Sequence, residues 1–216
     1  MKIKAIICDM DGVLVDARDW HYETLNKALA LFGYKIERHE HLTTFDGLPT
    51  STKLKMLSAD RGLPESLHSF INEMKQTYTA DTVILSCRPI FHIQYALRML
   101  KARGFKLAVA SNSVRGSVSL MMEKSHLSQY LDLQLSNEDV ASPKPAPDIY
   151  IKAMQMLGVS PEETLIIEDN AHGIAAAKAS GAHVLEVSDP SGVNLDNIMN
   201  RISEIEGKGL AQVVNA

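Results

Sequence analysis

The sequence predicts an α/β fold, with a mostly parallel sheet covered by helices on both faces and a helical insert after the first strand. Three observations lead to this prediction. From residue 90 onward, segments with helical spacing alternate with short apolar strands, as in right-handed βα units. The apolar stretch Ile3 to Cys8 has the length of a buried strand. Between residues 16 and 80 no stretch has the pattern of a buried strand, so we expect helices there.

Within the insert, apolar residues recur at helical spacing in three segments. The expected helices are Trp20 to Phe32, Thr50 to Asp60 and Pro64 to Tyr78. Gly33 follows the first as a helix stop, and a turn at Gly47-Leu48-Pro49 precedes the second. We therefore expect a core made of residues 1–15 and 82–216, interrupted by a helical cap of residues 16–81.

The second half of the chain supplies the remaining strands and the helices that cover the sheet. The expected strands are Phe105 to Ala110, Leu131 to Leu135, Thr164 to Ile167 and His183 to Val187. The expected helices are Ile90 to Arg103, Val114 to Lys124, Pro147 to Leu157, Ala171 to Ser180 and Asn194 to Ile205. The tail from Gly207 to Ala216 is expected to fray.

Composition and charge favour small-molecule chemistry in a reducing compartment. The net charge of −4 among 216 residues argues against a mainly electrostatic nucleic-acid binder. No stretch approaches the roughly 20 apolar residues that span a bilayer, so we expect no membrane partner. The two cysteines, Cys8 and Cys87, lack the spacing of a metal pair and fit a reduced cytoplasm. We expect a monomer or a weak dimer.

Two carboxylates follow the first strand directly. Asp9 and Asp11 are spaced i, i+2 and are followed by Gly12. At the carboxyl end of a parallel strand they would lie where open α/β sheets place their chemistry. Because neighbouring carboxylates repel, the pair implies either a divalent cation or one protonated acid. The alternative is a solvated acidic turn, since Asp and Gly are common turn residues.

Three further polar stretches follow later strands or precede helices. Ser111-Asn112-Ser113 offers hydroxyl, amide and backbone N–H groups for an anion, or only a helix cap. Lys144, between two prolines, could neutralise a carboxylate or phosphate, or lie in solvent. Glu168-Asp169 could hold a cation, or only cap a helix. Because parallel strands end at one edge, we expect all of these residues to meet there.

These residues, in this order, resemble the four motifs of the haloacid dehalogenase superfamily. The motifs are Asp9-Met10-Asp11-Gly12-Val13, Ser111-Asn112, Lys144 and Glu168-Asp169. The insert that begins near Asp16 resembles the small α-helical cap of that superfamily, and Asp169 to Gly181 is similar to its β-phosphoglucomutase and phosphatase branch. The resemblance implies a Rossmann-like sheet with a cap.

The resemblance also implies a mechanism in which an aspartate carries the phosphoryl group. Asp9 would be the nucleophile, and Asp11, with a raised pKa, would be the acid and then the base. Ser111 and Lys144 would hold the phosphoryl oxygens. The implied enzyme is a magnesium-dependent phosphatase that hydrolyses a small phosphorylated metabolite, such as a sugar phosphate.

The expected metal is Mg²⁺, because the acids at this edge supply the oxygen ligands it prefers. The resemblance makes Asp169 a direct ligand beside Asp9, with Glu168 acting through water. Asp11 completes the expected acidic set. A carbon–halogen or carbon–phosphorus bond is a less favoured target, because the branches that cleave such bonds lack the second aspartate.

Specificity is expected to come from the cap. His21 falls where the mutase has a cap histidine, and Asp46-Gly47-Leu48-Pro49-Thr50 resembles the mutase substrate loop. We therefore expect Asn112, His21, Gly47 and Thr50 to bind substrate. The mutase has an arginine for a second phosphate where this chain has Thr50, which removes a bidentate anion clamp. Lys53 or Lys55 could compensate, although helical lysines are commonly solvated.

Two other functions stay open on sequence alone. A β-phosphoglucomutase-like phosphosugar mutase is the first, although the loss of arginine at Thr50 weakens it. A non-catalytic phospho-receiver domain is the second, because it also gathers acids, a hydroxyl and a lysine at a sheet edge. The receiver is the more distant alternative, since it needs no helical insert.

Overall fold

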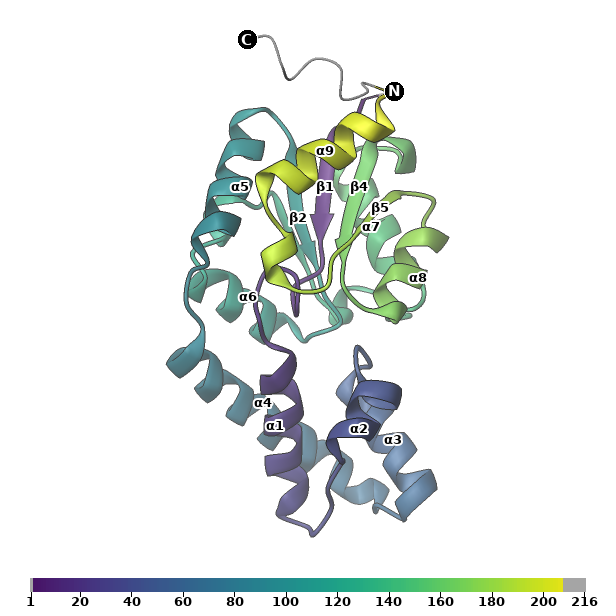
Figure 1. Cartoon of the computed structure of the whole chain (residues 1–216). Coiled ribbons are helices and arrows are strands. Elements are labelled where there is room, and N and C mark those ends of the chain that lie inside the picture. Colours follow the sequence, from purple (N-terminus) through teal and green to yellow (C-terminus); the bar gives the residue numbers. More distant parts are fainter. Residues whose placement is uncertain (1, 208–216) are drawn as a thin grey trace.

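A five-stranded parallel sheet forms the centre of the protein (Figure 1). The computed structural model describes residues 2–207, so most of the tail expected to fray lies outside the described residues. The strand order is β3-β2-β1-β4-β5, with β1 in the middle. The strands are β1 (Ala5–Cys8), β2 (Lys106–Ala110), β3 (Leu133–Leu135), β4 (Thr164–Glu168) and β5 (His183–Glu186).

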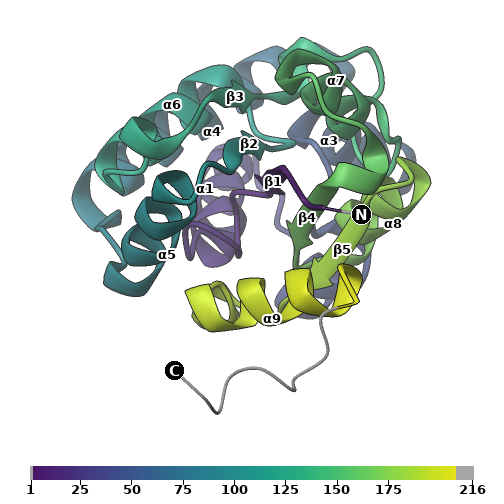
Figure 2. The same ribbon diagram turned by 90° about the horizontal axis from the view of Figure 1, so that it is seen from above.

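Helices cover both faces of the sheet, because alternate strand residues point to opposite sides and both sides are apolar. Ile6 and Cys8 share one hydrophobic cluster with α5, α6 and α9, whereas Ala5 and Ile7 share another with α7 and α8 (Figure 2). These helices are α5 (Phe91–Ala102), α6 (Arg115–Lys124), α7 (Asp148–Leu157), α8 (Ala171–Ala179) and α9 (Leu195–Ile205). Short 3-10 turns lie at Glu65–Leu67, Ser128–Tyr130, Asn137–Asp139, Pro161–Glu163 and Pro190–Gly192.

The insert between β1 and β2 forms a helical cap with its own hydrophobic core. Its helices are α1 (Arg18–Ala30), α2 (Arg38–Glu40), the π-helix His41–Phe45, α3 (Thr50–Arg61) and α4 (His68–Ser86). Buried residues such as Leu29, Leu57 and Ile71 form a cluster separate from those of the sheet. In Figure 1 the cap faces the carboxyl ends of the strands. The α/β class and the helical cap after β1 are therefore confirmed.

The largest difference from the expected elements is at α4, which continues to Ser86 rather than ending at Tyr78. Thr79 and Val83 extend the buried i, i+4 row, although β-branched residues are weak helix formers. Tyr78 packs against the cap cluster and Val83 belongs to a sheet cluster, so α4 itself joins the two parts. The division after residue 81 stays a prediction. No helix among residues 2–207 is long and apolar enough to cross a membrane.

Candidate active site

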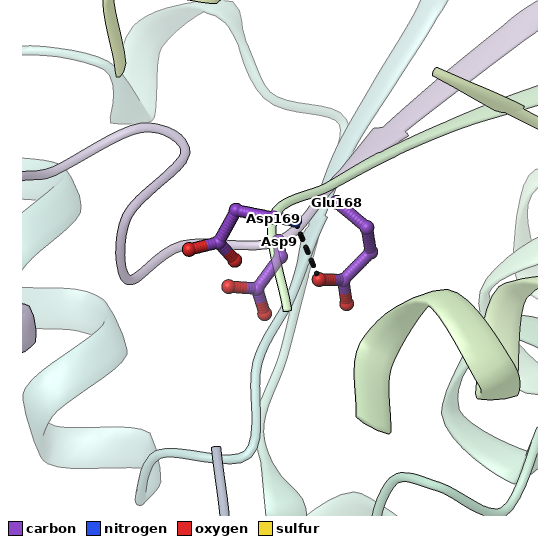
Figure 3. Close-up of side chains that lie close together, drawn as sticks. All are labelled: Asp9, Glu168 and Asp169. Atoms are coloured by element: carbon purple, nitrogen blue, oxygen red, sulfur yellow. Dashed lines mark hydrogen bonds between the residues drawn. The ribbon is translucent and has the colours of Figure 1, made fainter. Parts of the chain in front are cut away.

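The carboxyl ends of β1 and β4 bring three acids together. Asp9 follows β1 and Glu168 is the last residue of β4, and the parallel register pairs Cys8 with Ile167. The Asp9 N–H donates to the Ile167 carbonyl at 2.9 Å, which continues this register by one step. Ligand atoms of Asp9, Glu168 and Asp169 all lie within 4.8 Å of one another (Figure 3). The order of the strands thus joins residues that are about 160 positions apart in the sequence.

Lys144 lies at the centre of this acidic group and not in solvent. Its side chain is only 4% exposed, and its ammonium donates to Asp9 Oδ1 at 2.6 Å and to Glu168 Oε1 at 2.7 Å. It also donates to the Ala110 carbonyl at 2.9 Å. Asn112 holds the backbone of Lys144 through both ends of its amide, at 3.0 and 3.2 Å. One lysine therefore serves two buried carboxylates.

Glu168 is fully buried, and its surroundings fit its carboxylate closely. Besides Lys144, the Tyr150 hydroxyl donates to Oε1, and the Asp169 N–H donates to Oε2 at 3.1 Å. A Cβ on Gly173 would overlap the Glu168 carboxylate, so only glycine fits at that turn of α8. Glu168 does not cap α8, because Asn170 does so by accepting from the Gly173 N–H at 3.1 Å.

Asp169 has one occupied and one free carboxylate oxygen. Arg18, the first residue of α1, donates to Oδ2 through Nε at 2.8 Å and through Nη2, and also to the Ser188 carbonyl at 2.7 Å. Oδ1 is buried and has no hydrogen-bond partner among the residues described. Sequence reasoning missed Arg18, because it belongs to no motif and stands beside other charged residues at a helix start.

The charges of this cluster suit a divalent cation. Burial raises the pKa of Asp9 well above its usual value; Lys144 opposes this shift, while Glu168, Asp169 and Asp11 add to it. Burial likewise raises the pKa of Asp169 to about 6, although Arg18 opposes the shift. Three carboxylates face two cations, and the buried Asp169 Oδ1 has no hydrogen-bond partner among the described residues, so it is available to a cation. The residues present therefore fit a hard, oxygen-bound ion such as Mg²⁺.

Asp11 lies outside this cluster, and its carboxylate points to the cap. Its Oδ1 pairs with His21 Nε2 at 2.9 Å, and its Oδ2 accepts from the Ser113 hydroxyl at 2.9 Å. Burial alone would raise the pKa of Asp11, but the charge and hydrogen bond of His21, the Ser113 hydrogen bond and the charge of Lys75 outweigh burial and lower it. Asp9 alone therefore does not raise the pKa of Asp11, and the rise expected beside a phosphate stays a prediction. A place for Asp11 among the metal ligands stays a prediction.

His21 connects Asp11 to Lys75 on the cap helix α4. The Lys75 ammonium donates to His21 Nδ1 at 3.1 Å, so the ring proton of a neutral His21 lies on Nε2, from which it donates to Asp11. Burial lowers the pKa of His21; the charge of Asp11 opposes this effect, and Lys75 adds to it. The sequence singled out His21 but not Lys75, whose position on α4 looks like that of any solvated helical lysine.

A cavity of about 150 Å³ lies between the cap and the strand ends. From the predicted set it is lined by Asp9, Asp11, His21, Gly47, Thr50, Ser111, Asn112, Lys144 and Asp169. Glu168 stands behind Lys144 and does not line it. The cavity is also lined by residues that the sequence did not predict as site residues, namely Arg18, His41, Asn72, Lys75, Gln76, Asn137 and Asn170. The structure thus brings the predicted residues to one site and adds a second wall from the cap.

Ser111 lies on the sheet side of the cavity and Gly47 on the cap side, and their contacts show how the two sides are positioned. The Ser111 N–H donates to the Leu135 carbonyl at 3.0 Å, which continues the β2–β3 ladder, and its hydroxyl accepts from the Ser113 N–H at 3.0 Å. The Gly47 carbonyl accepts from the Asn112 amide at 3.1 Å. Gly47 has φ +71°, and a Cβ there would lie 2.8 Å from the Asn170 amide. A side chain would therefore push the cap loop away from the core.

Comparison with known proteins agrees with this geometry. Residues 6–187 match the profile of the haloacid dehalogenase-like hydrolases. A phosphorylated carbohydrates phosphatase of Thermotoga maritima is 28% identical over 184 residues, which cover 83% of this chain and 82% of the relative. A phosphoglycolate phosphatase of Aquifex aeolicus is 28% identical over 179 residues, again covering 83% and 82%.

A solved structure supports the fold. The crystal structure of a β-phosphoglucomutase from Clostridium difficile has a TM-score of 0.82 at 20% identity, and the match covers 95% of this chain and 99% of that one. The profile match spans all four motifs, from Asp9 to Asp169, together with the whole cap. The chain therefore belongs to the haloacid dehalogenase-like hydrolase family, in the branch of β-phosphoglucomutase-like and phosphoglycolate phosphatase-like proteins that carry a helical cap, and it is a phosphatase of phosphorylated small molecules.

Proposed function

We propose that this phosphatase hydrolyses a small phosphorylated metabolite, such as a sugar phosphate or phosphoglycolate, through a phosphorylated Asp9. The observation that carries the proposal is the position of Lys144, whose ammonium is 2.6 Å from Asp9 in a cluster whose third carboxylate, Asp169, has a free oxygen. Two relatives that are 28% identical are named a phosphorylated carbohydrates phosphatase and a phosphoglycolate phosphatase. A cavity of about 150 Å³ lies between this carboxylate cluster and the cap.

In the first half-reaction a carboxylate oxygen of Asp9 attacks phosphorus. The new Asp9 O–P bond forms as the ester P–O bond breaks, and Asp11 donates a proton to the departing alcohol. The contacts of Asp11 with His21 and Ser113 favour its charged form. A phosphoryl anion bound beside Asp11 would raise its pKa and so supply the acid that this step needs.

In the second half-reaction the ionised Asp11 accepts a proton from water as the water oxygen attacks phosphorus. The Asp9 O–P bond breaks as the new P–O bond forms, and inorganic phosphate leaves, with Asp9 again a carboxylate and Asp11 again protonated. Lys144 and the Ser111 hydroxyl would hold phosphoryl oxygens as charge builds on them. A magnesium ion held by Asp9 and Asp169 would neutralise part of that charge.

The proposal is tested with a panel of hexose phosphates, nucleotides and phosphoglycolate, with release of inorganic phosphate as the readout. Asp9→Asn should abolish release while the far-ultraviolet circular dichroism stays that of the wild type. Asp11→Asn should slow breakdown of a ³²P-labelled phospho-enzyme. A near wild-type rate for Asp9→Asn would contradict the proposal. Turnover of glucose 1-phosphate that needs a bisphosphate primer and releases no phosphate would instead favour the mutase.

A further inference from the structure

Arg18 ties the first turn of the cap helix α1 to the segments that follow β4 and β5. Its guanidinium donates to Asp169 Oδ2 through Nε at 2.8 Å and through Nη2, and Nη2 also donates to the Ser188 carbonyl at 2.7 Å. The ion pair lies directly over the backbone of Gly12, where a Cβ would overlap both Asp169 Oδ2 and Arg18 Nε. A cation of the cap is therefore held against a candidate metal ligand of the core.

The positive charge of Arg18 would oppose a metal ion on Asp169. The Asp169 side chain is only 1% exposed and that of Arg18 is 35% exposed, so water screens the pair only from one side. Asp169 Oδ1, the other oxygen of the same carboxylate, has no hydrogen-bond partner among the described residues. A cation bound there would share one carboxylate with Arg18, and the two positive groups would repel each other. We therefore expect Arg18 to lower the affinity of the site for a divalent ion.

The same charge should favour a phosphoryl group. Asp9, Glu168 and Asp169 carry three negative charges when ionised. Lys144 and Arg18 supply two positive charges, so the cluster keeps one negative charge. A divalent ion turns this into one positive charge, whereas without Arg18 the loaded site would be neutral. Because Arg18 lines the same cavity as Asp9, a phosphoryl anion there should bind the positive site more tightly than the neutral one.

We propose that Arg18 has opposite effects on the two ligands of the site: it weakens the binding of Mg²⁺ alone and strengthens the binding of the phosphoryl group once Mg²⁺ is present. The complex that holds both metal and anion is then favoured over the site that holds the metal alone. The inference rests on the proposed function, because it concerns the metal and the phosphoryl group of the same site.

The test measures two dissociation constants by calorimetry on the full-length protein, with no ester present. The first is that of Mg²⁺ alone, and the second is that of inorganic phosphate at saturating Mg²⁺, both at one ionic strength. Arg18→Met should bind Mg²⁺ about 5- to 50-fold more tightly and phosphate about 3- to 10-fold more weakly than the wild type. The effect on phosphate is smaller because Arg18 bonds to Asp169, while the phosphoryl group would lie beside Asp9.

Two further variants separate the charge of Arg18 from its hydrogen bonds. Arg18→Gln keeps an N–H donor for Asp169 but loses the charge, so both constants should change in the same directions as in Arg18→Met. Arg18→Lys keeps the charge, so both constants should stay near those of the wild type. Arg98→Met, at an exposed position of α5, is the control for loss of an arginine elsewhere. Thermal melting of each variant checks that it is folded.

Weaker binding of both ligands by Arg18→Met would show that Arg18 only orients Asp169, and this result would overturn the inference. Any other pattern without opposite changes, including no measurable binding of Mg²⁺ or phosphate to the wild type, would also overturn it. Absence of phosphate release from every ester by the wild type would instead refute the proposed function, and the two dissociation constants would still decide the role of Arg18.

Discussion

At the scale of single residues, two cationic side chains neutralise three buried carboxylates at the strand ends. Lys144 bonds to both Asp9 and Glu168, and Arg18 occupies one oxygen of Asp169 while the other stays free. An unpaired buried carboxylate is costly, so the cluster is stable only with all of its cations in place. This makes the candidate metal site sensitive to Arg18, a residue of the cap helix α1 outside the four motifs.

Arg18→Met should lower the free energy of unfolding of the metal-free protein by about 1–3 kcal/mol, because Asp169 loses a charged partner. Mg²⁺ should then raise the melting temperature of this variant more than that of the wild type, since the ion replaces the lost positive charge. Thermal melting with and without Mg²⁺ measures both effects. Arg98→Met, at an exposed position of α5, is the control. An equal Mg²⁺ effect in wild type and Arg18→Met would contradict the prediction.

Lys53 should make stability depend on pH in a defined direction. Its pKa is about 8 in the folded protein and 10.5 when unperturbed, so between these values the unfolded chain binds more protons. The free energy of unfolding therefore rises with pH in that window, by an amount on the order of 3 kcal/mol. Lys53→Met should be more stable than the wild type at pH 7.5, and the difference should shrink toward pH 10.5.

Urea denaturation at pH 7.5, 9 and 10.5 checks this prediction. Lys75 has a pKa of about 8 for the same reason, burial, so part of the rise should remain in Lys53→Met. Lys55→Met, at an exposed position of the same helix, should leave the pH dependence of the wild type unchanged. A gap between wild type and Lys53→Met that widens with pH would show that Lys53 is not buried in its charged form.

At the scale of elements, each strand end is positioned by the element that follows it. α8 approaches β4 so closely that Gly173 has no room for a Cβ beside Glu168. Gly173→Ala should lower the free energy of unfolding by about 1–3 kcal/mol, because the buried carboxylate must move. It should also reduce turnover, because Glu168 shares Lys144 with Asp9.

Denaturation and steady-state kinetics measure the two effects of Gly173→Ala. Gly116→Ala is a matched control, since Gly116 lies in α6 and a Cβ there meets nothing within 4 Å. We expect that control to be neutral or more stable by about 0.5–1 kcal/mol, because alanine favours helix. Equal changes in the free energy of unfolding and in turnover for the two substitutions would contradict the prediction that the close packing of α8 against Glu168 limits this position to glycine.

At the scale of the whole molecule, the hydrophobic core of the cap and the two hydrophobic clusters of the sheet lie on opposite sides of a shared cavity. The cap core and the sheet clusters are separate, and the Gly47 loop contacts Asn112 and Asn170 across the cavity. Gly47→Ala should therefore reduce kcat/KM by about tenfold or more, because the cap wall can no longer approach the phosphoryl site.

Gly33→Ala separates this effect from backbone strain. Gly33 has φ +77°, close to the +71° of Gly47, but a Cβ there meets nothing within 4 Å. Both variants should lose about 1–2 kcal/mol of stability from the left-handed backbone, and only Gly47→Ala should lose activity. Steady-state kinetics and denaturation of Gly33→Ala and Gly47→Ala test this prediction. Equal activities of the two variants would show that activity does not need the close contact of the Gly47 loop with the core.

The sequence alone determined the sheet, the cap and the residues at the strand ends. Buried strands and amphipathic helices have local periodicities that can be recognised in a sequence. Because a parallel sheet brings all strand ends to one edge, the sequence also predicted that Asp9, Lys144 and Asp169 lie close together. The family then followed from the order of the motifs.

Only the tertiary structure decided which cap residues face the site. Lys53 and Lys55 are about 200° apart around α3 at 3.6 residues per turn, so one must point inward and the other outward. Periodicity does not say which of the two faces the cavity, because that depends on how α3 is rotated against α4 and the strand ends. Arg18 and Lys75 could not be predicted as site residues for the same reason. Their partners, Asp169 and His21, are distant in the sequence and are brought near only by the packing of the protein.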